Sequence, residues 1–202
     1  MLLAGCGNPY YGAMEKVGIH KRDIMVDRVE SARNAQEDAQ EQFKSALEQF
    51  DSVVSLKETD LKKAYEQLNE EYEDCVAVAE KVSARIDKVE DVSEALFDEW
   101  EEEIDLYENK DLARSSKKQL TDTKARYREM IARMEEAEQS MDPVLRIFRD
   151  NVLFLKHNLN AQAIGSLQQE FAGLEAEIDK LIARMSEAIE SSNAFIADMQ
   201  TL

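Results

Sequence analysis

Apolar side chains recur along this chain at alternating steps of three and four residues, and this repeat constrains the fold more than any other feature. It occurs in four runs, and nearly all of their positions are apolar, against 44% hydrophobic residues in the whole chain. This spacing puts one apolar stripe on each of four helices and predicts coiled-coil-like heptad packing. The runs are Met25, Val29, Ala32, Gln36, Ala39, Phe43, Ala46, Phe50 and Val53; Leu61, Tyr65, Leu68, Tyr72, Cys75, Ala79, Val82, Ile86, Val89, Ser93, Leu96 and Trp100; Leu120, Thr123, Tyr127, Met130, Met134, Ala137, Met141, Val144 and Phe148; and Ile164, Leu167, Phe171, Leu174, Ile178, Leu181, Met185, Ala188, Ser192, Phe195, Met199 and Leu202.

Helix-ending residues separate the runs. Capping residues at 55–60 and at 109–111 predict turns between the first three helices. The heptad phase slips between the third and fourth runs, which predicts a turn at 157–160. Asp142 and Pro143 look like a helix start, but the phase continues across them, so they predict a kink within the third helix.

The first, third and fourth runs also carry apolar residues beside their heptad positions, which widens the stripe to suit a bundle. These residues include Leu47, Val54, Ile131, Leu145, Ile182, Ile189 and Ile196. Short connections require antiparallel neighbours. The sequence therefore predicts an all-α fold, an elongated antiparallel four-helix bundle over residues 19–202, with helices on the order of 60 to 70 Å long. The alternative is a long hairpin that closes its core as a homodimer, as crescent-shaped membrane-bending domains do.

Charge narrows the classes of partner. A net charge of −18 would repel a phosphate backbone, so we expect no nucleic-acid partner. No stretch of 18 apolar residues is present to span a membrane. Residues 90–108 are acidic and residues 114–133 are mostly basic, so the fold-back between them predicts ion pairs across the two helices.

The sequence contains little from which to build a catalytic site. The two histidines, His20 and His157, should lie at opposite ends of the bundle, and neither follows a Glu at the spacing of di-metal bundle proteins. We therefore expect no enzyme activity, no cofactor and no metal. Cys75 lies on a heptad position and is predicted to be an inert packing residue.

The segment 3–6, Leu-Ala-Gly-Cys, resembles the lipobox at which bacterial lipoprotein signal peptides are cleaved. This resemblance implies that Cys6 is lipidated and that residues 1–18 are a leader remnant and tether. The chain would then be held at a membrane by a lipid anchor. The alternative is an ordinary N-terminus.

Residues 152–155, Val-Leu-Phe-Leu, are apolar on all sides of their helix and precede the predicted turn at 157–160. A helix end of this kind must be covered, either by the core at the bundle tip or by a partner protein of unknown identity. The candidate docking residues are Val152, Leu153, Phe154, Leu155, His157, Asn158 and Asn160.

Segments 13–23, 42–47, 95–100 and 152–161 resemble the signature segments of a domain-of-unknown-function family of predicted lipoproteins in Gram-negative bacteria. The resemblance implies an envelope protein at the periplasmic face of the outer membrane and supplies no activity. We expect a structural spacer or protein-interaction module. The alternative is a soluble periplasmic chaperone or stress adaptor, although the repeated Leu-Thr-x-x-Gln motif of small helical chaperones is missing.

Overall fold

The computed structural model describes residues 11, 14, 18–55, 61–159 and 161–201. Five helices account for most of these residues, and the described part of the chain contains no strand. The helices are α2 (Lys21–Ser55), α3 (Leu61–Asp105), α4 (Lys110–Gln139), α5 (Met141–His157) and α6 (Ala161–Gln200). The all-α prediction is confirmed.

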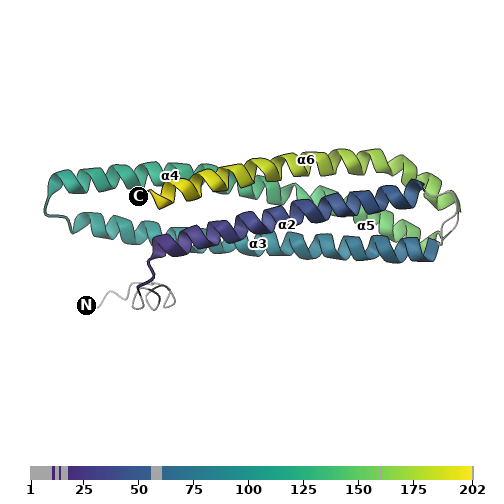
Figure 1. Ribbon diagram of the computed structural model, residues 1–202, viewed down its shortest axis with the longest axis horizontal. Helices are drawn as coiled ribbons and strands as arrows, with labels where there is room; N and C mark the ends of the chain where they lie inside the picture. The colour runs from purple at the N-terminus through teal and green to yellow at the C-terminus, as the bar shows by residue number, and fades with distance from the viewer. Residues whose placement is uncertain (1–10, 12–13, 15–17, 56–60, 160, 202) are drawn as a thin grey trace.

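The helices form four antiparallel rods, with α4 and α5 together making the third rod (Figure 1). Helix α2 packs against α3 and α6, and the α4–α5 rod packs against α3 and α6 as well. The ring of contacts therefore closes within one chain. The predicted elongated four-helix bundle is confirmed, and the alternative core shared between two copies is not the arrangement seen.

Heptad spacing explains which faces are buried. Every described position of the four runs is buried or half-buried, and Phe43, Phe50 and Phe148 are fully enclosed. Burying a large apolar side chain contributes about 1.5–3 kcal/mol, so one continuous apolar stripe per helix is enough to drive assembly. Tyr11, which lies inside the predicted tether, is also buried against this core.

The third rod is interrupted at Ser140, immediately before the predicted kink at Asp142 and Pro143. Pro143 has no N–H to donate to the carbonyl of Gln139, the residue at which α4 ends. Ser140 keeps helical backbone angles, φ −76° and ψ −9°, and its hydroxyl donates to the carbonyl of Ala137. The rod therefore continues across the interruption.

The described turns lie where the sequence predicts them. Asn109 caps α4, because its Oδ1 accepts hydrogen bonds from the backbone N–H groups of Asp111 and Leu112. Helix α5 ends at His157 and α6 begins at Ala161. The connection between α2 and α3, residues 56–60, lies outside the described residues. None of the described helices is both long and apolar enough to cross a bilayer.

Candidate functional site

Exposed apolar side chains gather at the two ends of the bundle. The hairpin end is the turn between α3 and α4, and the distal end is the junction of α5 and α6 at the opposite tip (Figure 1). Large exposed apolar residues at the hairpin end are Leu106, Tyr107 and Leu112, and those at the distal end are Leu153, Phe154 and Leu159.

The structure divides the predicted docking segment at the distal end. Leu153 and Phe154 are 46% and 41% exposed, whereas Val152 and Leu155 are 3% and 0% exposed. Val152 and Leu155 follow Phe148 at helical spacing and face the core. The prediction that these two residues contact a partner is therefore wrong.

The polar residues of that segment lie at the end of α5. His157 is exposed and is the last residue of the helix. Asn158 is half-buried, and its Nδ2 donates to the carbonyl of Phe154 at 2.9 Å, so its amide closes the helix end. Asn160 lies outside the described residues. The exposed part of the predicted surface therefore consists of Leu153, Phe154 and His157.

Phe154 forms part of an open groove of about 450 Å³ between α5 and α6. Ile147 and Leu167 supply apolar surface, and the carboxylates of Asp150 and Glu170 lie along it. Such a groove suits an apolar side chain flanked by a basic one. The groove lining is Ile147, Asp150, Asn151 and Phe154 from α5 with Ser166, Leu167, Gln169 and Glu170 from α6.

The α6 side of the groove was not predicted from the sequence. Residues 165–170 carry one apolar heptad position, Leu167, among small and polar residues, a pattern that an ordinary solvated helix also has. Only the packing of α6 beside α5 brings Ser166 and Gln169 next to Phe154.

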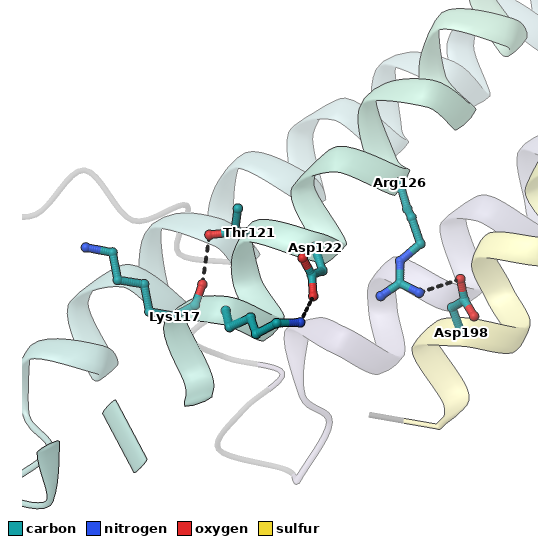
Figure 2. A network of polar contacts seen from close by, with 6 residues as sticks. Lys117, Thr121, Asp122, Arg126 and Asp198 are labelled. Atoms are coloured by element: carbon teal, nitrogen blue, oxygen red, sulfur yellow. Dashed lines mark hydrogen bonds and ion pairs between the residues drawn. The ribbon is translucent and has the colours of Figure 1, made fainter. Parts of the chain in front are cut away.

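A second groove, of about 340 Å³, lies between α4 and α6 and is lined mainly by charged residues. Arg126 Nη1 lies 2.9 Å from Asp198 Oδ2, and Arg133 Nη1 lies 2.9 Å from Glu187 Oε2. Figure 2 shows Arg126 reaching across to Asp198 on α6, whereas Lys117 points away from this contact. Because these charges are paired across the helices, the groove offers less free charge than its composition suggests.

The predicted ion pairing between α3 and α4 is present at Lys124 Nζ and Glu101 Oε1, 2.5 Å apart. The hydrogen bond from Lys124 lowers the pKa of Glu101 below its ordinary value. Arg126 and Arg133, which the sequence also placed opposite the acidic part of α3, pair with α6 instead.

Groups that could take part in chemistry are dispersed. Cys75 is fully buried with a free thiol, and burial raises its pKa to about 12, so it is unreactive as predicted. His20 and His157 are exposed at opposite ends of the bundle. Among the described residues no group of three His, Cys, Asp or Glu side chains is placed to hold a metal ion. Cys6 lies outside the described residues.

The fold and its surfaces define an all-α four-helix bundle whose most distinct features are apolar patches at its two ends. The model of the DUF2959 family, described as a protein of unknown function, matches residues 10–199. The chain therefore belongs to this family. Neither the curated proteins nor the solved structures include a significant match to it.

Proposed function

We propose that this protein is an envelope lipoprotein, anchored by lipid on Cys6 at the periplasmic face of the outer membrane, whose bundle is a spacer and protein-interaction module. Its distal end would dock a partner protein through Leu153, Phe154 and the groove beside them. The observation that carries the proposal is the exposed Phe154 groove at the opposite end from the start of α2.

The shape of the molecule supports a spacer role. Helix α2 starts near one end of the bundle, and α5 ends at the other (Figure 1). An anchor ahead of α2 would therefore hold the distal end away from the membrane. The distance would be on the order of 60 Å, because the longest helices contain 45 and 40 residues at a rise of about 1.5 Å each.

The groove supports docking by its composition. Exposing a large apolar side chain to water is unfavourable, yet Phe154 is 41% exposed and Leu153 beside it is 46% exposed. Asp150 and Glu170 add negative charge along the groove. A partner helix with one apolar anchor and neighbouring Lys or Arg side chains is the chemistry that this surface would recognise.

The anchor is tested by expressing the full chain with its native leader in a Gram-negative host and measuring palmitate incorporation. We expect labelled protein in the outer-membrane fraction and complete release by Cys6→Ala, since several acyl chains hold a protein stably where one does not. Unlabelled wild-type protein in the soluble periplasmic fraction would favour the chaperone or adaptor alternative.

Docking is tested by placing a photo-crosslinking amino acid at Phe154 in cells, with the same amino acid at Lys117 as a matched exposed control. We expect one defined adduct from position 154 that disappears when Leu153→Ser is added. Equal adducts from both positions would contradict a docking role for the distal end.

A further inference from the structure

We propose that the hairpin end inserts shallowly into a neutral lipid surface through Leu106, Tyr107 and Leu112. This inference rests on the proposed function, because it assigns a second membrane contact to an anchored protein. It differs from the lipid anchor, since it concerns side chains of the turn between α3 and α4 and not Cys6.

The hairpin projects beyond the rest of the bundle. Figure 1 shows the turn between α3 and α4 extending past both the start of α2 and the end of α6. The ion pair between Lys21 and Glu99 places the start of α2 level with residue 99 of α3. The turn at Leu106 is thus about 10 Å further out, at a rise of about 1.5 Å per residue.

The projecting part is held by its own contacts. Trp100 Nε1 donates to Ser116 Oγ at 2.9 Å, and the rings of Phe97 and Tyr127 meet edge to face with centroids 5.4 Å apart. The hydrogen bond between Trp100 and Ser116 joins α3 to α4 beyond the start of α2, whereas Tyr127, further from the turn, also meets Phe195 of α6. The hairpin can therefore present its turn as a formed surface.

The turn exposes apolar side chains that no described helix covers. Leu106 is 79% exposed, Leu112 is 54% exposed and Tyr107 is 40% exposed. A bilayer surface suits this set, because leucines favour the acyl region and tyrosine favours the interface with its ring apolar and its hydroxyl wet.

The length of the preceding chain allows the contact. Because Tyr11 is buried against the core, the free length is residues 6–11, which can span at most about 17 Å when extended. That reach exceeds the roughly 10 Å by which the turn projects past the start of α2. A lipid on Cys6 and the side chains of the turn can therefore occupy the same bilayer.

The negative charge around the turn determines which lipid headgroups it can approach. Acidic residues around the turn outnumber basic ones, and the chain as a whole carries −18. The acidic residues at 101–111 are Glu101, Glu102, Glu103, Asp105, Glu108 and Asp111, against Lys110. An anionic surface would repel this tip, so we expect contact with zwitterionic lipids.

The experiment uses a tryptophan at the turn as a depth probe in the full chain. Tyr107→Trp places it there, and native Trp100 is kept because it joins α3 to α4 through Ser116. The quenching of Trp100 is measured in the otherwise unchanged chain and subtracted. The protein is coupled chemically through Cys6 to a maleimide lipid in phosphatidylcholine vesicles that contain brominated acyl chains. Cys75 does not compete because it is buried. Since this anchor is chemical, failure of lipidation in cells would leave the measurement intact.

We expect bromine to quench the tryptophan at 107 and not one placed at Phe154 as the matched control. Leu106→Ser should lower the inserted population by about tenfold, because each exposed leucine gains roughly that factor on leaving water. Added phosphatidylglycerol should reduce quenching at low salt. Circular dichroism and thermal unfolding would establish that each variant is folded.

Two results would overturn the proposal. One is an unquenched tryptophan at 107 in folded, anchored protein. The other is a blue shift that grows with protein concentration in the absence of vesicles, which would mean that the hairpin end joins a second copy of this chain.

Discussion

Two aromatic clusters occupy the core, and they differ in the polar atoms around them. In the distal half, Phe50 meets Phe148 at 6.1 Å and Phe171 at 6.0 Å, and Tyr72 meets Phe148 at 6.0 Å between ring centroids. The buried polar residues of this half, within the described part of the chain, are Ser140 and Asn151, and their side chains donate to the carbonyls of Ala137 and Ile147.

The hairpin-side cluster consists of Phe97, Tyr127 and Phe195, with centroid distances of 5.4 and 6.3 Å. Buried Ser93, Thr123 and Ser192 lie on the same stretches of α3, α4 and α6, and Gln36 is buried further along α2. Among the described residues, the buried side-chain atoms without a hydrogen bond are Gln36 Oε1 and Thr123 Oγ1.

This difference shows that equal heptad spacing does not mean equal stability. A buried polar atom without a partner costs about 1–3 kcal/mol, so the hairpin-side half loses part of what its apolar burial contributes. We expect the distal half to hold the fold together and the hairpin-side half to open first.

The largest change in the free energy of unfolding is expected from a substitution in the distal aromatic cluster. Phe148→Ala should lower the free energy of unfolding by about 3–5 kcal/mol, because it removes a fully buried ring from contact with two others. Phe195→Ala should cost less, and the exposed Phe154→Ala should stay within about 1 kcal/mol. Urea unfolding followed by circular dichroism measures all three. A loss at Phe195 as large as at Phe148 would remove the contrast between the halves.

A change of intermediate size in the free energy of unfolding is expected from substituting Gln36. Gln36→Met keeps the shape of the side chain and removes its unpartnered oxygen, while giving up only a long hydrogen bond of 3.4 Å to the carbonyl of Met134. We expect the protein to become more stable by about 1 kcal/mol. Asn151→Leu, in the distal half, removes a satisfied amide and should bring no gain. Stabilisation by both substitutions in thermal unfolding would contradict the assigned difference.

The smallest effect concerns two carboxylates on the surface of the hairpin-side half. Burial, and then the neighbouring carboxylates led by Glu135, raise the pKa of Glu90, whereas the hydrogen bond from Lys124 lowers that of Glu101. A raised folded-state pKa makes charged Glu90 destabilising at neutral pH, and this penalty is relieved as pH falls through that pKa. Charged Glu101 is stabilising above its unfolded pKa, and its contribution is lost as pH falls through the lowered value.

Glu90→Gln should therefore raise the melting temperature slightly at pH 7 and have no effect below about pH 4. Glu101→Gln should lower it slightly at pH 7, with the difference again fading in acid. Melting curves across this pH range, at low and high salt, separate the two. Shifts of the same sign at pH 7 would show that the two carboxylates do not differ in the way their surroundings indicate.

The sequence by itself determined the secondary structure, the buried face of each helix and the positions of the described turns. These follow from spacing that any α-helix of this sequence must have, since residues three and four apart always share a face. The inert character of Cys75 follows in the same way from its heptad position.

Only the tertiary structure decided which end of each helix is covered and which charges meet. Arg126 pairs with Asp198 and not with α3, and Val152 turns into the core while Phe154 borders a groove with α6. The projection of the α3–α4 hairpin depends on where α2 starts and α6 ends beside it (Figure 1). These features depend on the register between helices that are distant in sequence. Local spacing does not encode this register, because each helix can slide by a heptad and still bury the same stripe.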